Sequence, residues 1–383
     1  MTQTATSPRP EVPSSSRTVA VLHWRRAYAM LVAIAVIMGG LCVICSKSLN
    51  YPLRDPDGFL GPAWIRLPLL VGGAFIADVV PRTLFRSRGN PTRYITEARL
   101  LIKEHWTRER ITLVVVGLIG FYVTYVSYRN LKNFLPFIRS DSSGHAKLYD
   151  YQLHRFDEWL LFGHDPATVL HKLLGTGFVA YILSWDYLIF LPMVPISVVV
   201  WAVWSKNVSF GYWFITAQCI CWGLGTLSYY LVPTLGPNFA SPWLYKDLPL
   251  TGVSKLQDSL FNGRQSVLWN PFADGVQSVA GFASLHVAIT VTLALVGQHT
   301  LRTRALRIGL WVYSGVTIVS TTYFGWHYIA DDMAGLLIAL IAVYLGGLGT
   351  GQKFDRWGRR SHPTTATSGV PIEDVAEGLV DAR

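Results

Sequence analysis

The sequence predicts an all-α, polytopic membrane helix bundle with about eight transmembrane helices. Of the 383 residues, 51% are hydrophobic and only 15% are charged, and the mean hydropathy is +0.33. A soluble protein of this length needs more polar surface than that. The apolar residues also gather in stretches of roughly 17 to 25 residues, the length that a helix needs to cross the hydrocarbon of a bilayer.

Eight such stretches set the expected domain boundaries. The second is interrupted by Arg66 and Pro68, and the fourth contains Asp186, Pro192 and Pro195, which predict a kink. The stretches lie near residues 27–47, 62–80, 111–129, 178–203, 211–232, 282–298, 307–324 and 328–347. We therefore expect a disordered cytoplasmic N-terminus, two additional transmembrane helices, a basic cytoplasmic linker, a six-helix catalytic domain and a disordered cytoplasmic tail, at residues 1–26, 27–81, 82–110, 111–347 and 348–383.

The basic residues predict how the chain is oriented. The net charge is +10. The 82–110 segment holds eight Lys or Arg residues, the linker at 299–307 holds three, and the flanks of the first and last spans are basic as well. By the positive-inside rule these regions and both termini face the cytoplasm of an integral plasma membrane protein, and the long loops at 130–177 and 233–281 face outside. No base-stacking or groove-reading motif accompanies the basic residues, so nucleic-acid binding is not expected.

The first outer loop contains "YDYQLHRFDEWLLFGHDPATVLHKLL", whose apolar residues recur at helical spacing. This pattern predicts an amphipathic helix along the outer membrane surface. We expect Asp157 on the solvated face of that helix.

The cysteines indicate neither a disulfide framework nor a metal site. Cys42, Cys45, Cys219 and Cys221 all lie inside apolar runs, where they are expected to pack as small apolar side chains. No metal and no cofactor are expected.

Two histidines stand at the outer ends of apolar runs, in "GFASLHVAIT" (His286) and "TTYFGWHYIADDMAGLL" (His327). A helix N-terminus presents free N–H groups that can receive a phosphate, and Ser284 is a candidate N-cap whose hydroxyl can add a donor. Asp331 follows His327 by one helical turn and can accept the imidazole Nδ1–H, which leaves Nε2 as a nucleophile. Asp332 points roughly 100° further round the helix and is the weaker candidate.

These motifs resemble those of the type 2 phosphatidic acid phosphatase (PAP2) superfamily, whose second and third motifs are usually written P-S-G-H and S-R-x5-H-x3-D. The S-L-H variant at 284–286 is similar to the inositol phosphorylceramide synthase branch, the Aur-type inositolphosphotransferases. The resemblance covers the third to eighth spans, on the residues "ASLH", "LVPTLGPNF" at 231–239, and Ser320, Thr321, His327 and Asp331.

The resemblance implies a role for each residue. His327 attacks phosphorus and becomes a phosphohistidine, with Asp331 orienting it. His286 protonates the leaving lipid alcohol and later takes a proton from the incoming hydroxyl, while Ser284 helps to hold the phosphoryl oxygens. The partners implied are a phospholipid substrate in the membrane and an alcohol or water as acceptor.

Three positions depart from the superfamily motifs. Ala283 replaces proline, Leu285 replaces glycine, and Thr321 replaces the arginine that clamps phosphate. The K-x6-R-P first motif is not found. Arg264 and Lys255, in the second outer loop, are the candidates for the missing positive charge.

The function predicted first is transfer of an inositol-phosphate-type headgroup from a phospholipid to an alcohol at the outer membrane face. The second is a lipid phosphate phosphatase that acts on phosphatidic acid or polyprenyl phosphate with water as acceptor. The third is a transporter or structural membrane protein with a relic motif, which Asp186 and the prolines of the fourth span favour. Taken alone, His286 could be a packing histidine, and the pair of His327 and Asp331 could be a structural hydrogen bond.

Overall fold

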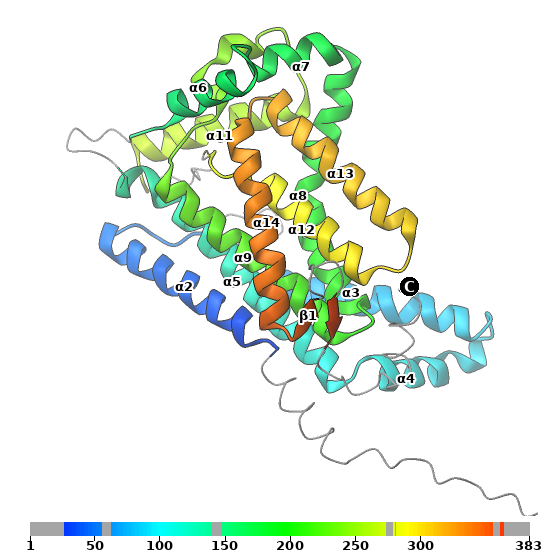
Figure 1. Ribbon diagram of the computed structural model, residues 1–383. Helices are drawn as coiled ribbons and strands as arrows, with labels where there is room; N and C mark the ends of the chain where they lie inside the picture. The colour runs from blue at the N-terminus through cyan, green and yellow to red at the C-terminus, as the bar shows by residue number, and fades with distance from the viewer. Residues whose placement is uncertain are drawn as a thin grey trace, which may run out of the picture.

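The computed structural model describes residues 27–55, 63–139, 147–272, 279, 281–354 and 361–363. These residues form an all-α bundle, which confirms the predicted fold class (Figure 1). The disorder expected for residues 1–26 and for 364–383 lies outside the described residues.

Each of the eight predicted stretches corresponds to a helix. These are α2 (Ala29–Leu49), α3 (Ala63–Arg86), α5 (Arg108–Ile138), α8 (Phe178–Trp204), α9 (Val208–Leu231), α12 (Leu285–Thr300), α13 (Arg304–Tyr323) and α14 (Ile329–Gly349). In the described part of the chain, five of them are long and apolar enough to cross a membrane, namely α2, the Pro68–Arg86 part of α3, α5, α8 and α14, and α12 is a shorter apolar helix. The chain is therefore an integral membrane protein.

Helix α9 lies at the centre of the bundle and packs against α2, α5, α8, α12 and α14. Its side chains are largely buried there, including the polar Thr216 and Gln218. Beside it, α12 and α14 approach closely at Gly335, where an added Cβ would lie 2.5 Å from the carbonyl oxygen of Ser284. This close contact brings the starts of the two helices together.

A cap of short helices covers one end of the bundle (Figure 1). It consists of α6 (Asp150–Leu160), α7 (Pro166–Leu174), α10 (Pro237–Ala240), the 3-10 helix η3 (Pro242–Tyr245) and α11 (Gly252–Trp269). The single amphipathic helix predicted in the first outer loop is thus two helices. The chain turns between them at Gly163, where φ is +88°, and Asp165 then caps α7 by accepting from the N–H of Ala167 at 2.9 Å.

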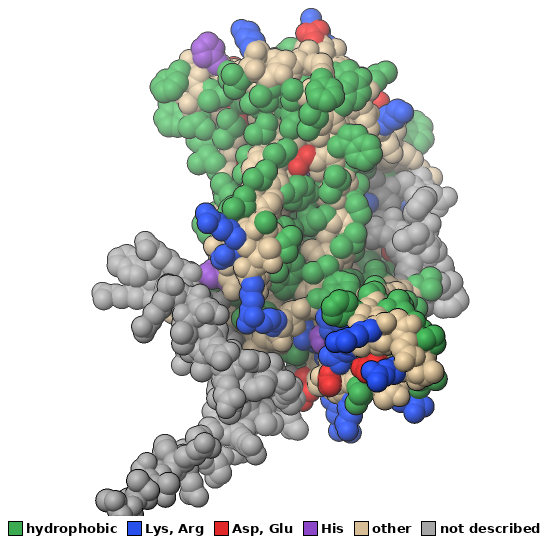
Figure 2. Space-filling view, turned by 90° about the vertical axis from the view of Figure 1, so that its right-hand side faces the viewer, with side chains coloured by type: hydrophobic (Ala, Val, Ile, Leu, Met, Phe, Trp, Pro, Cys, Tyr) green, Lys and Arg blue, Asp and Glu red, His purple; other side chains and the backbone are tan. Residues whose placement is uncertain are grey.

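The opposite end of the bundle carries the 3-10 helix η2 (Pro91–Arg93) and α4 (Tyr94–His105), which continue from α3. The buried Asp78 of α3 accepts from the indole N–H groups of Trp106, at 2.9 Å, and Trp204, at 2.7 Å, and pairs with Arg82. Figure 2 shows Lys and Arg side chains gathered towards this end and hydrophobic side chains covering much of the bundle above it. Within the segment expected to be disordered, β1 (Gln352–Phe354) pairs with β2 (Ser361–Pro363).

Candidate active site

The two sequence-predicted histidines lie side by side beneath the cap. His286 is in the first turn of α12, and His327 stands two residues before α14. Their ring centroids are 5.8 Å apart, with the planes inclined by 56°. The pair is close enough for a single phosphoryl group to touch both rings.

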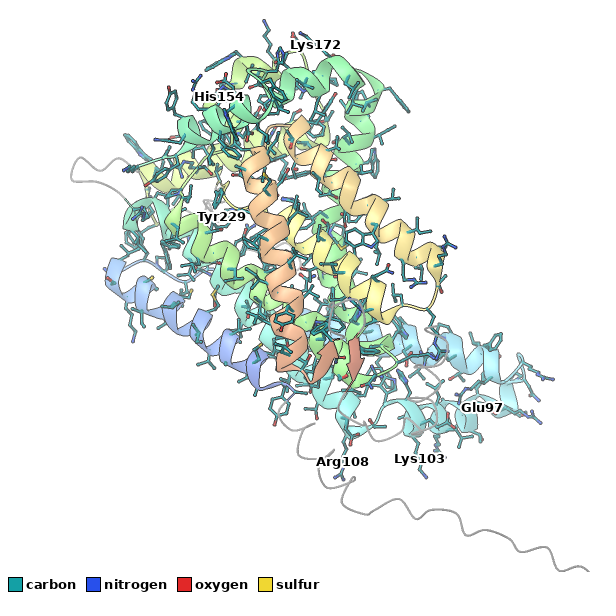
Figure 3. The ribbon with its side chains drawn as sticks, in the orientation of Figure 1. Glu97, Lys103, Arg108, His154, Lys172 and Tyr229 are labelled. Atoms are coloured by element: carbon teal, nitrogen blue, oxygen red, sulfur yellow. The ribbon has the colours of Figure 1, made fainter. Side chains whose placement is uncertain are left out.

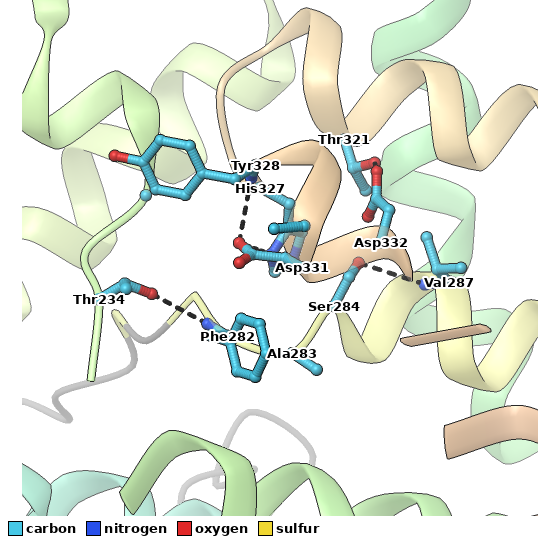
Figure 4. A network of polar contacts seen from close by, with 12 residues as sticks. Thr234, Phe282, Ala283, Ser284, Val287, Thr321, His327, Tyr328, Asp331 and Asp332 are labelled. Carbon is cyan, nitrogen blue, oxygen red and sulfur yellow. Dashed lines mark hydrogen bonds and ion pairs between the residues drawn. The ribbon is translucent and has the colours of Figure 1, made fainter. Parts of the chain in front are cut away.

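His327 and Asp331 form the contact that their spacing predicts. The Asp331 carboxylate Oδ2 lies 3.3 Å from Nδ1 of His327 and also accepts from the backbone N–H of Tyr328 at 3.0 Å (Figure 4). Because the His327 ring is buried, its pKa falls to about 4, so the imidazole is neutral at physiological pH.

Asp332 serves a different partner, as the helical geometry predicts. It accepts from the hydroxyl groups of Thr321, at 3.0 Å, and Thr322, at 3.2 Å. Thr321, which stands where the superfamily motif has arginine, is therefore engaged with a carboxylate and is not a cationic clamp.

His286 is enclosed by aromatic rings of α8. The Tyr187 ring stacks on it at 4.4 Å between centroids, and the Phe190 ring lies at 4.1 Å. Among the described residues, its buried Nε2 has no hydrogen-bond partner. Such a nitrogen can exchange a proton with a group that enters the site.

Ser284 caps α12, as expected. Its hydroxyl oxygen accepts from the N–H of Val287 at 3.4 Å (Figure 4). Its own N–H donates to the Asp331 carbonyl at 3.0 Å. Ser284 therefore joins the two histidine helices.

The start of α14 is not open to an anion in the way that the sequence suggested. Asp157 of α6 accepts from the N–H groups of Ile329, at 2.8 Å, and Ala330, at 3.3 Å. The expectation that Asp157 is solvated was wrong, because its side chain is 1% exposed. Helical periodicity identifies the faces of α6, but it does not reveal that one face meets the N-terminus of another helix.

A cation that the sequence reading missed lies near both histidines. Lys132 of α5 is buried, with Nζ 3.3 Å from the hydroxyl of Tyr128 and 5.0 Å from the centre of the Tyr229 ring. Its charge acts on both His286 and His327. Figure 3 places Tyr229 within the bundle, below the cap.

Lys132 also changes the conclusion about the first motif. Arg139 follows it with six residues between, so the K-x6-R part of K-x6-R-P is present and only the proline is replaced, by Ser140. The expectation that this motif is absent was wrong in its basic part. The spacing was the available signal, but Lys132 is hard to notice near the end of a helix that otherwise reads as an apolar span.

Of the two cations that the sequence proposed from the second outer loop, one is buried and the other is exposed. Arg264 of α11 is buried, and burial lowers the pKa of its guanidinium, an effect that the nearby charge of Asp150 partly offsets. Lys255, near the start of the same helix, is exposed, and no contact among the described residues connects it with either histidine. In the described ranges no group of three or more His, Cys, Asp or Glu residues could hold a metal ion.

The bundle and its histidine pair define an integral membrane protein with a polar site enclosed at one end of an all-α core. A family model described as the PAP2 superfamily matches residues 151–345, which is 195 of the 383 residues. The chain belongs to the PAP2 superfamily, and membership indicates phosphatase or phosphotransferase activity on a lipid phosphate in a membrane. Comparison with curated proteins and with solved structures finds no match.

Proposed function

We propose that this protein is a phosphotransferase that acts on a phospholipid at the outer face of the plasma membrane through a phosphohistidine at His327. The observation that carries the proposal is the pair of imidazoles 5.8 Å apart, one of them in contact with Asp331. The buried Lys132 supplies positive charge beside both rings.

The reaction has two balanced steps. Burial disfavours the charged form of His286, and the anionic phosphate bound beside it favours that form, so the ring takes up its proton when substrate binds. Nε2 of neutral His327 then attacks phosphorus, the bond from phosphorus to the lipid oxygen breaks, and protonated His286 gives its proton to that oxygen. In the second step, the acceptor hydroxyl loses its proton to His286 and attacks phosphorus, and the bond to His327 breaks. Lys132 stabilises the phosphoryl oxygens, whose negative charge increases on transfer.

The proposed acceptor is an alcohol, and the transferred group is of the inositol-phosphate type. The S-L-H motif at 284–286 supports this assignment. The alternative is hydrolysis of phosphatidic acid or a polyprenyl phosphate with water as acceptor, which superfamily membership supports equally.

The test uses full-length protein in lipid vesicles. Labelled phosphatidylinositol with an alcohol lipid reports headgroup transfer, and phosphatidic or polyprenyl phosphate reports release of inorganic phosphate. We expect transfer, an acid-labile label on His327, and loss of both in His327→Ala. We expect His286→Ala to lose turnover, and His164→Ala, at an exposed histidine of the cap, to retain it. Phosphate release without headgroup transfer would make the protein a phosphatase.

A transporter or structural role remains the competing class. Asp186, the residue that favoured it, accepts from the hydroxyl groups of Thr317, at 3.2 Å, and Ser320, at 3.1 Å. These bonds join α8 to α13, so the intramembrane carboxylate has an interhelical role that needs no transported ion. Unchanged cellular function of the His327→Ala protein would favour the competing class.

A further inference from the structure

Two buried carboxylates of the cap face the loop that carries His327. Asp150 and Asp157 stand seven residues apart on α6, which places them on one face of the helix. Their side chains are 8% and 1% exposed. The proposed chemistry does not use either of them.

Asp157 is one of two carboxylates that accept hydrogen bonds from backbone N–H groups at the start of α14. Its two oxygens accept from the N–H groups of Ile329 and Ala330, and Asp331 accepts from the preceding N–H, that of Tyr328. Three consecutive N–H groups directly after His327 are therefore held by carboxylates. One of these carboxylates is also the partner of the His327 ring.

Asp150 acts on the same loop from another direction. It accepts from the N–H groups of Leu235, at 3.0 Å, and Gly236, at 2.9 Å, and from the Tyr328 hydroxyl at 3.2 Å. Gly236 has φ +96°, and an added Cβ there would lie 2.5 Å from the Trp326 carbonyl oxygen. Asp150 thus ties the 231–239 stretch and the histidine loop to α6.

We infer that α6 is a positioning element, in which Asp157 and Asp150 hold the backbone on the C-terminal side of His327 so that its ring meets Asp331 and the phosphorus. This inference deepens the proposed function and rests on it. Neither carboxylate touches the reacting atoms. Their effect passes through Tyr328 and the first turn of α14, and a misplacement of about 1 Å in such a site can cost roughly 100-fold in rate.

The charge of Asp157 gives this inference a pH signature. Burial raises the pKa of its carboxyl to about 6. The other titratable groups that act on it or are affected by it are Asp331 of α14, His154 of α6 and Tyr245 of η3. Below pH 6 the protonated carboxyl is a weaker acceptor for the N–H groups of α14, so it resembles an asparagine.

The test compares Asp157→Asn with Asp165→Asn in the full-length protein. Asp165 is the matched control because it caps α7 in the same manner, accepting from Ala167 and Thr168. We expect Asp157→Asn to lower kcat about 10- to 100-fold at pH 7.5 with little change in KM. The ratio of wild-type to variant kcat should fall towards one below pH 6, and Asp165→Asn should match the wild type. A pH-independent ratio, or equal effects of both variants, would overturn the inference.

A second readout separates this inference from the proposed chemistry. Hydrogen exchange at the amides of residues 328–330 should be faster in Asp157→Asn than in the wild type, and unchanged in Asp165→Asn. Tyr328→Phe, which removes only the hydroxyl bond to Asp150, covers the case in which Asp157→Asn does not fold, and should lower kcat several-fold without raising KM. If the wild type turns over no lipid phosphate, the proposed function fails. If these amides exchange equally in all the proteins, the positioning role fails.

Discussion

Replacing Lys132 by methionine should separate activity from stability. The ammonium group is buried, and among the described residues it has one hydrogen bond, to the Tyr128 hydroxyl at 3.3 Å, and two ring contacts, at 5.6 Å from Tyr128 and 5.0 Å from Tyr229. Each ring contact is worth roughly 0.5 to 2 kcal/mol, whereas burying an ammonium costs several kcal/mol. Methionine fills similar space without the charge. The free energy of unfolding should therefore stay within about 1 kcal/mol of the wild type, or rise.

The loss of activity should be large. If Lys132 stabilises the phosphoryl oxygens in the transition state, its removal costs about 3 to 4 kcal/mol, or roughly 100- to 1,000-fold in kcat. The assay is turnover of the lipid substrate in vesicles, together with a thermal unfolding curve in detergent. Activity within threefold of the wild type, or activity lost only in step with the folded fraction, would refute the assignment of Lys132 to the site.

Arg110 provides the opposite control at the other end of α5. Its buried guanidinium donates to the Ala202 carbonyl at 3.1 Å and to Ser205, through the hydroxyl at 2.9 Å and the carbonyl at 2.6 Å. Arg110→Met leaves these acceptors without a donor and should lower the free energy of unfolding by about 3 kcal/mol. The activity of the protein that remains folded should not change. Lys132→Met and Arg110→Met should therefore show reversed patterns.

Two further predictions concern the geometry and protonation of the histidine pair. Gly335→Ala places a Cβ 2.5 Å from the Ser284 carbonyl oxygen and must separate α12 from α14. We expect kcat to fall at least about tenfold and the melting temperature to drop. Gly309→Ala is the control, because its Cβ meets no atom within 4 Å, and it should leave both quantities unchanged. The pKa of His327 is lowered to about 4 from its ordinary 6.5. As the pH falls, the unfolded chain therefore binds a proton at this histidine at a higher pH than the folded chain does. Stability should fall as the pH drops from 6.5 to 4, and His327→Gln should lose that part of the pH dependence. Identical melting curves against pH for both proteins would contradict this.

The helices and the central pair could be predicted because both follow from local spacing. Apolar stretches of membrane length became long helices, and the four-residue step from His327 to Asp331 fixed their contact in advance. Ser284 could be recognised as a cap because it directly precedes an apolar run. The partnership of His286 with His327 required the further premise that both helices start on the same side, which the positive-inside pattern provided.

The missed residues are those whose role depends on contacts between distant parts of the chain. Asp157 lies 172 positions from Ile329, whose N–H group it binds. The local sequence "HRFDEWL" does not predict that contact. Lys132 reads as one polar residue at the end of a span until the fold places it beside the two rings. In the sequence, Lys255 and Arg264 were both candidates for the positive charge that binds phosphate, yet the Lys255 side chain is exposed.

The carboxylates around α14 also decide where a substrate phosphate can be held. A helix N-terminus attracts an anion only while its N–H groups are free. Here Asp157 and Asp331 already occupy those of residues 328–330, so a phosphate placed there would have to displace their carboxyl groups. In the proposed mechanism the phosphate lies on the side of the histidines that faces Lys132. If Lys132 supplies the positive charge, the departure at Thr321 does not remove the cation from the site, because the cation comes from α5 and the start of α14 serves to hold His327 in place.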